Sequence, residues 1–463
     1  MGGWTIVMDV GKTHSKATLW DESGACQALR VYANERLSRG PVNLDASGIE
    51  TWLEAVLREY AKKGPVDAII PVAHGAGVAV LRGNHLRFAP LDYEWSGVSA
   101  DRATYDRQRD PFAYTGSPAL PAGLNLGVQL HWLEANDSEG LRDVTILPWA
   151  QYWAWLLCGV PAAEVTSLGC HSDLWRPSDA TPSALCVRRG WADRMAPLTP
   201  ADQVLGTLDS RWIGRTGLSS RVRVYCGLHD SNAALLDARC HLAMRGHDAT
   251  MLSTGTWFVA MRSPLQLDKS LLESLPEHRD CLVNVDPRGA AVPSSRFMGG
   301  REIELLAGNS TPPANSTSDL DQQIAIDAIK GNRMILPAGV RGVGPFPNAF
   351  RAPTDLKLEH PRVESYLYAA MLADVSLDLI GSCDTLLVEG RFAGAPVFVQ
   401  ALAALRPTMK VLIGADDHGV ARGALRLAGI GHIESPALSQ VGALPVEISQ
   451  YKSAWREAAE RAA

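Results

Sequence analysis

The stretch "MDVGKTHSKATLWD", residues Met8–Asp21, places a polar turn between two apolar runs near the start of the chain. Trp4–Val10 is rich in β-forming residues, and Lys16–Trp20 can pair back on it. This pattern predicts a β-hairpin around Gly11, with Gln27–Ala33 as a third strand.

The residues of this turn suit a phosphate group. Gly11 lets the backbone approach a ligand closely, and Thr13 offers a hydroxyl. Lys12 and Lys16 supply positive charge, and Asp9 can hold a magnesium ion directly or through water. An ordinary polar surface hairpin explains the same residues, so the turn alone does not establish a function.

The composition is that of a globular chain of 463 residues, long enough for two domains, with 46% hydrophobic residues. The net charge of -6 argues against nonspecific nucleic-acid binding. The eight cysteines include no C-x-x-C pair, which favours reduced thiols and a cytoplasmic protein. We expect no signal peptide, and we expect Val144–Ala163 to be a buried helix whose ends are marked by prolines rather than a membrane span.

The two halves share one feature, a hairpin whose turn carries Gly and small hydroxyl residues. "ATMLSTGTWFVAM" predicts two strands broken by a polar turn at Ser253, Thr254, Gly255 and Thr256. Strands alternating with helices predict an α/β fold with largely parallel pairing in each half. Two such turns facing each other across a cleft would offer backbone N–H groups and hydroxyls to a polyphosphate from both sides.

A candidate base lies in "CGLHDSNAALL". Asp230 follows a β-rich run and precedes an expected helix, so its carboxylate should lie at the C-terminal end of a strand. Such a carboxylate can accept the proton of a substrate hydroxyl during phosphoryl transfer. Asp is also a favoured helix N-cap, and both roles can hold together.

With these segments together, the chain resembles the FGGY family of carbohydrate kinases, in the actin/hexokinase superfamily. The matching pieces follow the family's order along the chain: "DVGKTHSK", "GLHDSNAA", "STGTW", "FMGGRE", "LLVEGRFAGAPVFVQALAAL" and "DDHGVARGALRLAG". The resemblance implies two actin-like (ribonuclease H-like) α/β domains with a cleft between them. We expect residues 1–225 to be the sugar-binding domain and residues 226–463 the nucleotide-binding domain.

The resemblance also implies roles for single residues. Asp9 and Asp230 would hold Mg²⁺, and Asp230 would also be the catalytic base and contact the sugar. The residues that would bind ATP are Gly11, Lys12, Thr13, Lys16, Ser253, Thr254, Gly255, Thr256, Gly344, Gly390 and Arg391.

The chain departs from the family at two places. The family usually has Thr or Ser at the position of Lys12, so this extra cation can strengthen phosphate binding or point outward. A Gly-Gly-Gly-Ala stretch of the family is replaced by Glu389-Gly390-Arg391-Phe392. Arg391 and Phe392 can stack on the adenine base or simply pack.

Candidate sugar ligands lie in the first half: His74, Asp92, Tyr93, Glu94 and His171. Structural histidines and a solvated loop at "LDYEW" are the alternatives for these residues. The stretches "SLGCHSDLW" and "DYEW" look nearest to the rhamnulokinase and fuculokinase branch.

The sequence therefore predicts an ATP- and Mg²⁺-dependent kinase for a small ketose such as L-fuculose or L-rhamnulose. The alternatives are a kinase for another polyol or pentulose, and a catalytically silent sugar-binding regulator of the same fold. The presence of both Asp9 and Asp230 disfavours the silent regulator. Neither a nucleic acid nor a membrane is an expected partner, and a homodimer is left open.

Overall fold

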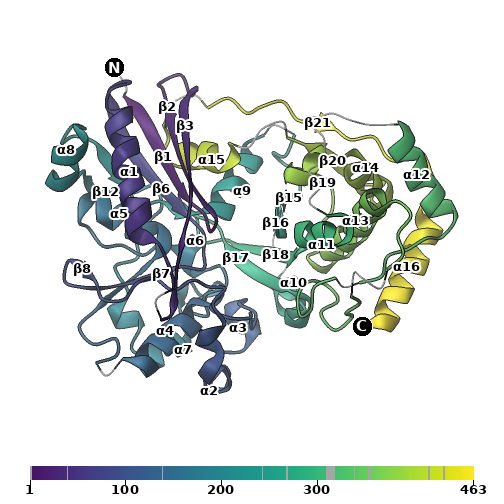
Figure 1. Cartoon of the computed structure of the whole chain (residues 1–463), viewed down its shortest axis with the longest axis horizontal. Coiled ribbons are helices and arrows are strands. Elements are labelled where there is room, and N and C mark those ends of the chain that lie inside the picture. Colours follow the sequence, from purple (N-terminus) through teal and green to yellow (C-terminus); the bar gives the residue numbers. More distant parts are fainter. Residues whose placement is uncertain are drawn as a thin grey trace. The chain divides into compact units, whose positions relative to one another are not determined.

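The structure is a computed structural model that describes residues 3–38, 40–137, 139–241, 243–266, 269–308, 319–337, 339–352, 356–414, 418–430 and 433–463. The chain forms two compact units (Figure 1). The first comprises Met1–Asp237, Val283–Ala291 and His418–Ser435, and the second comprises Ala238–Leu282, Val292–Asp417 and Pro436–Ala463. The boundary expected between residues 225 and 226 stays a prediction.

The first unit is built on a seven-stranded sheet in the order β12-β13-β6-β1-β2-β3, with β14 also paired to β6. Its strands are β1 Trp4–Val10, β2 His14–Trp20, β3 Cys26–Ala33, β6 Val66–Ala73, β12 Val204–Thr207, β13 Arg223–Tyr225 and β14 Leu228–His229. Its main helices are α1 Ala46–Tyr60, α4 Leu126–Asn136, α5 Trp149–Cys158, α6 Val165–Leu168, α8 Ser210–Thr216 and α15 Gly419–Leu427.

Helices cover both faces of this sheet. Ile6 and Met8 of β1 share a core cluster with Leu53 of α1, whereas Val7 shares another with Leu425 of α15. A strand buried on both faces reads as a continuous apolar run, which is why β1 shows little alternation. Figure 1 shows α15, drawn in yellow-green, beside the purple strands, so a segment from near the C-terminus completes the first unit.

The expectation of largely parallel pairing is wrong in both sheets. β1 pairs with β6 in parallel, but β1 with β2 and β2 with β3 are antiparallel. The hairpins add antiparallel strands at the side of a parallel centre because a tight turn needs no crossover helix.

The apolar stretch Val144–Ala163 contains the expected buried helix α5, which starts after Pro148. A short strand, β9 Thr145–Pro148, precedes it and was not predicted. β9 pairs with β7 Val78–Arg82, and β7 also pairs with β8 His85–Leu86.

The second unit is built on a sheet in the order β17-β18-β16-β15-β19-β20-β21. Its strands are β15 Ala249–Thr254, β16 Phe258–Ser263, β17 Cys281–Val285, β18 Ala291–Phe297, β19 Thr385–Gly390, β20 Lys410–Ile413 and β21 Ser439–Gln440. Its main helices are α11 Gly299–Ala307, α12 Asp319–Lys330, α13 Pro361–Leu379, α14 Pro396–Leu405 and α16 Ser449–Ala462. Helix α9, Asp230–Cys240, runs from the first unit into the second.

All eight cysteines are free thiols. Within the described parts of the chain, no helix is both long and apolar enough to cross a membrane.

Candidate functional site

Three parallel strands of the first unit end at the same level. Val10 of β1 is opposite Ala73 of β6, and Ala73 is opposite His229 of β14. The next residues, Gly11, His74 and Asp230, therefore leave the sheet side by side at its C-terminal edge. This is the edge at which open α/β sheets bind ligands.

Two carboxylates, Asp9 and Asp230, come from the ends of β1 and β14 at this edge, and the charge of Asp230 acts on Asp9. The pKa of Asp9 is raised to about 7, mainly by burial and also by the negative charge of Asp230, while the charge of Lys16 opposes the shift. Lys16 is opposite Asp9 in the β1–β2 ladder. A second acid that keeps a neighbouring carboxylate near neutrality is a common arrangement where a cation binds or a proton moves.

The carboxylate of Asp230 is oriented by its neighbours. Its Oδ1 accepts hydrogen bonds from the backbone N–H and hydroxyl of Ser231, and His229 Nε2 lies 3.2 Å away. The side-chain amide of Asn232 lies 3.2 Å from His229 Nδ1, which assigns the ring proton to Nε2 and directs it to Asp230. Among the described residues these contacts all go to Oδ1, which leaves Oδ2 to accept a proton from a substrate.

His74 is a neutral, enclosed imidazole. Its pKa is lowered to about 3, mainly by burial and also by the positive charge of Lys12 and by the nearby His229. Both ring nitrogens are buried and have no hydrogen-bond partner within the described parts of the chain. Tyr93 and Trp149 flank the ring, with centroids 5.4 Å and 6.4 Å away. A buried imidazole without partners is costly unless a ligand supplies them.

Lys12 turns toward the candidate sugar residues. Its ammonium forms an ion pair with the fully buried Asp92, lies 3.8 Å from Glu94 and stands 4.6 Å from the centroid of the Tyr93 ring. Arg36 also pairs with Asp92, at 2.5 Å. Burial alone would raise the pKa of Asp92, but the hydrogen bond and charge of Lys12 hold it below its usual value.

The rest of the first turn is held by Asn34. Its side-chain amide donates to the carbonyl of Gly11 at 2.9 Å, and its oxygen accepts from the hydroxyl of Ser15. Thr13 and Lys16 are exposed, so their polar groups are accessible to a ligand.

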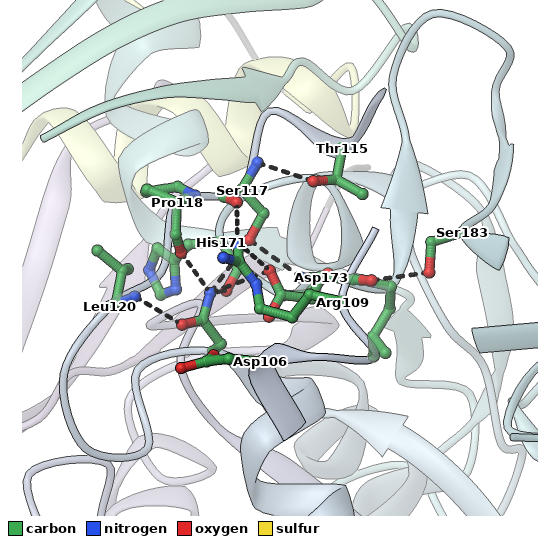
Figure 2. Close-up of polar contacts among 12 residues, drawn as sticks. Asp106, Arg109, Thr115, Ser117, Pro118, Leu120, His171, Asp173 and Ser183 are labelled. Carbon is green, nitrogen blue, oxygen red and sulfur yellow. Dashed lines mark hydrogen bonds and ion pairs between the residues drawn. The ribbon is translucent and has the colours of Figure 1, made fainter. Parts of the chain in front are cut away.

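His171 belongs to a different network, shown in Figure 2. Its Nδ1 lies 2.7 Å from the carbonyl of Leu124, and its own carbonyl accepts from Asn125. Asn125 also bonds Ser117 and Asp173, so these contacts tie His171 to a buried scaffold. The adjacent Cys170 donates to the carbonyl of Gly75, next to His74, at 3.6 Å. The sugar-binding role of His171 stays a prediction.

In the second unit, the residues of the other turn meet the end of β19. Gly390 is opposite Thr254 in the parallel β15–β19 ladder, and it has a φ of +85°. A Cβ on Gly390 would lie 2.5 Å from the carbonyl oxygen of Thr254, so a larger residue would collide there. The hydroxyl of Thr254 is engaged internally, because it donates to the carbonyl of Glu389 and accepts from the N–H of Phe392.

The start of α11 packs against the same turn. A Cβ on Gly300 would lie 2.0 Å from the carbonyl oxygen of Gly255, and the N–H of Arg301 donates to the carbonyl of Thr256 at 3.4 Å. Ser253 is half-buried and Thr256 is exposed. The turn, the β19 end and the N-terminus of α11 therefore meet, and a helix N-terminus favours anionic groups.

Gly344 is linked to this region through an ion pair. Its N–H donates to Asp280, which pairs with Arg296 at 2.7 Å. The Arg296 guanidinium lies 4.6 Å from the centroid of the Trp257 ring, directly behind the turn. Gly344 has a φ of +79°, which favours glycine at this position.

Arg391 and Phe392 differ in their surroundings. Phe392 is fully buried against Phe258, which settles its role as core packing. Arg391 is 32% exposed and pairs with Glu304 of α11 at 2.7 Å. Its role in nucleotide binding stays a prediction.

Three residues of the site, His229, Asn34 and Trp149, were not predicted from sequence. The signal for His229 was its position directly before Asp230, at the end of a strand. Asn34 and Trp149 carry no local signal, because their partners are distant in sequence.

The acids present suit magnesium better than a metal held wholly by protein side chains. Within the described residues, no three or more His, Cys, Asp and Glu side chains form a metal-binding group. Mg²⁺ typically takes one or two carboxylates and completes its shell with water and substrate phosphates. The pair Asp9 and Asp230 fits this pattern.

The comparisons with known proteins agree with this arrangement. The profile described as "Carbohydrate kinase FGGY, C-terminal domain" matches residues 246–436. The solved structure of a carbohydrate kinase from Novosphingobium aromaticivorans is 46% identical, with a TM-score of 0.90 and 99% of each chain covered. The chain belongs to the FGGY family of carbohydrate kinases. It is therefore a phosphotransferase, and kinases of this family use ATP as a substrate.

More distant structures share the fold. A ligand-bound xylulose kinase from Lactobacillus acidophilus is 14% identical, with a TM-score of 0.80 and coverage of 99% of this chain and 97% of the other. A glycerol kinase from Plasmodium falciparum, solved with ADP, is 13% identical, with a TM-score of 0.77 and coverage of 99% and 98%. No curated protein sequence matches the chain. The family and the two-domain α/β fold predicted from sequence are confirmed, whereas the rhamnulokinase and fuculokinase branch stays a prediction.

Proposed function

We propose that this carbohydrate kinase transfers the γ-phosphoryl group of ATP to a hydroxyl of a small ketose bound in the first unit. The observation that carries the proposal is the edge at which Gly11, His74 and Asp230 leave three aligned strands, with His229 directly before Asp230. It combines an oriented carboxylate with a neutral imidazole that has no partner among the described residues.

Asp230 acts as the base. Its Oδ2 takes the proton of the sugar hydroxyl while the hydroxyl oxygen attacks the γ-phosphorus of ATP. The bond between the γ-phosphorus and the oxygen that bridges it to the β-phosphate breaks, and ADP is released. His229 holds the carboxylate through Oδ1, which keeps Oδ2 directed to the sugar.

His74 binds the sugar. A neutral imidazole has one donor and one acceptor nitrogen, and sugar hydroxyls can satisfy both. Lys12 contributes from the side of Asp92 and Tyr93, where its ammonium can donate to a further hydroxyl while the aromatic ring faces the C–H groups of the sugar.

Each turn offers phosphate ligands within its own unit. Thr13 and Lys16 serve this role in the first unit, and Ser253, Gly255 and Thr256 in the second. Asp9 and Asp230 would hold Mg²⁺, which neutralises the phosphate charge when it is bound.

L-fuculose and L-rhamnulose are the first substrates to test. The experiment measures ADP release from ATP over a panel of ketoses, pentuloses and polyols, with Asp230→Asn as the control. A ketose that gives fast ADP release, lost in Asp230→Asn, supports the proposal. Release with a polyol or pentulose alone would favour the other kinase assignment. Sugar binding by calorimetry without ADP release would favour a silent regulator.

A further inference from the structure

The strand that leads to Asp230 contains a one-residue bulge. Val224 is opposite Ile69 of β6, and Leu228 is opposite Val72. Four residue steps separate Val224 from Leu228, but three steps separate their partners, so one extra residue is inserted before the catalytic segment. Because a one-residue shift sends each side chain to the other face of a sheet, the bulge determines which way His229 and Asp230 point.

Glycine makes the bulge possible. Gly227 has a φ of +75°, and a Cβ there would lie 1.9 Å from the carbonyl oxygen of Pro71. The N–H groups of Cys226 and Gly227 donate to the carbonyls of Gln203 and Ala201 and not to β6. The bulged backbone has therefore left the ladder and needs other groups to hold it.

Two buried side chains hold the bulge from its two ends. Gln151 of α5 donates to the carbonyls of Cys226 and Gly227, at 3.3 Å and 3.0 Å. The hydroxyl of Thr166, in α6, accepts the N–H of His229 at 3.0 Å. Both side chains are fully buried.

Glu164 determines which hydrogen bond the Thr166 hydroxyl donates and which one it accepts. Thr166 Oγ1 donates to Glu164 Oε2 at 2.6 Å, so its proton is committed and its lone pair faces the N–H of His229. The Glu164 carboxylate also accepts from the N–H groups of Thr166 and Ser167, at 2.9 Å and 3.2 Å. Glu164 is fully buried, and burial raises its pKa to about 7.

We propose that Glu164 and Thr166 are positioning residues for phosphoryl transfer. They fix the backbone of His229, and through it the direction of the Asp230 carboxylate, without contacting the substrate. This inference rests on the proposed role of Asp230 as the base.

Thr166→Val is the sharpest test, because valine keeps the shape and removes the hydroxyl. The N–H of His229 would then be buried without a partner, and the backbone would shift to relieve the cost. We expect kcat to fall about 10–100-fold, the scale for misplacing a catalytic group by about an ångström. The KM for ATP should stay within about twofold, because the phosphate-binding residues are untouched.

Two further variants separate positioning from packing. Thr166→Ser keeps the hydroxyl and should restore kcat to within about threefold of wild type. Glu164→Gln keeps the shape but turns an amide NH₂ toward N–H donors, so kcat should fall as in Thr166→Val. Thr216→Val is the matched control: its buried hydroxyl donates to the carbonyl of Trp212 in α8, and we expect its loss to leave kcat unchanged.

The outcomes separate the positioning role of Glu164 and Thr166 from the role of Asp230 as the base. Thermal unfolding checks each variant, and Glu164→Gln carries the test if Thr166→Val does not fold. If Asp230→Asn abolishes turnover while Thr166→Val and Glu164→Gln keep wild-type kcat, the positioning role is wrong, but the role of Asp230 as the base is still supported. A kcat loss in Thr216→Val equal to that in Thr166→Val would also overturn it. If Asp230→Asn keeps full turnover, the proposed function itself fails.

Discussion

The two polar hairpin turns contain similar residues, but their side chains are used differently. In the first turn, Lys12 extends to Asp92 and Tyr93 and joins the candidate sugar residues. In the second, the hydroxyl of Thr254 is bound to the backbone of Glu389 and Phe392. The residue types made both turns look like phosphate loops, yet the segments that pack against each turn determine which groups a ligand can reach.

The turns also differ in the chemistry beside them. The first lies next to Asp9 and Asp230, whereas the second meets glycines of β19 and α11. We therefore expect substitutions near the first turn to change turnover and sugar binding, and substitutions in the second to change ATP binding or stability.

The largest effect is expected at Asp230. Asp230→Asn should lower kcat by about 10²–10⁴-fold, the usual scale for loss of a general base. ATP binding measured by calorimetry should change little, because the second turn is intact. Turnover within about threefold of wild type would show that Asp230 is only a helix cap.

The next effect is a pH dependence of stability from Asp9, whose folded pKa of about 7 lies above its unfolded value of 3.8. Between these values the folded state holds a proton that the unfolded state has released, so this carboxylate costs stability as pH rises, about 1.4 kcal/mol per pH unit. The free energy of unfolding of Asp9→Asn should therefore rise relative to that of wild type from about pH 4 to pH 7, and the difference should stay constant above pH 7.

Chemical denaturation in EDTA measures this difference. The folded pKa of His74, about 3, gives the opposite slope below its unfolded value of 6.5, but that contribution cancels in the comparison of Asp9→Asn with wild type. Added Mg²⁺ should stabilise wild type more than the variant above pH 7. A pH-independent difference between the two proteins would exclude the raised pKa.

Lys12→Met should act on the sugar. It leaves the buried Asp92 with Arg36, whose side chain is half exposed, and it removes a donor near His74. We expect the KM for the sugar to rise about tenfold, as for loss of one charged hydrogen bond, with a smaller change for ATP. Asp92→Asn and the double variant complete a double-mutant cycle that measures the coupling energy between Lys12 and Asp92. If the KM for ATP rises more than the KM for the sugar, Lys12 binds phosphate rather than sugar.

The smallest effect compares two threonines of the second turn. Thr254→Val should lower the free energy of unfolding by about 1–3 kcal/mol, because the carbonyl of Glu389 and the buried N–H of Phe392 each lose a hydrogen bond. Thr256→Val should leave stability unchanged and raise the KM for ATP about three- to tenfold. Thr13→Val should resemble Thr256→Val. The reverse pattern would place the phosphate contact at Thr254.

Much of the fold could be predicted from sequence because its signals are local. β1 matches the predicted strand Trp4–Val10, and α9 begins at Asp230, one residue before the expected start. The short strand β9 could not be predicted in this way, because its partner β7 lies more than sixty residues earlier and supplies the hydrogen bonds that define it. Nor could the mixed pairing of the sheets, since a strand's own residues do not encode the direction of its neighbour.

The same division applies to the site. Residue type and spacing within single segments were enough to predict the family, the two turns and the carboxylates Asp9 and Asp230. The ion pair of Lys12 with Asp92 and the hydrogen bond from the N–H of His229 to Thr166 are seen only in the folded chain. The partners are separated by 80 positions in the first contact and by 63 in the second. Sheet register and helix packing bring such distant residues together, and no single segment of sequence contains that information.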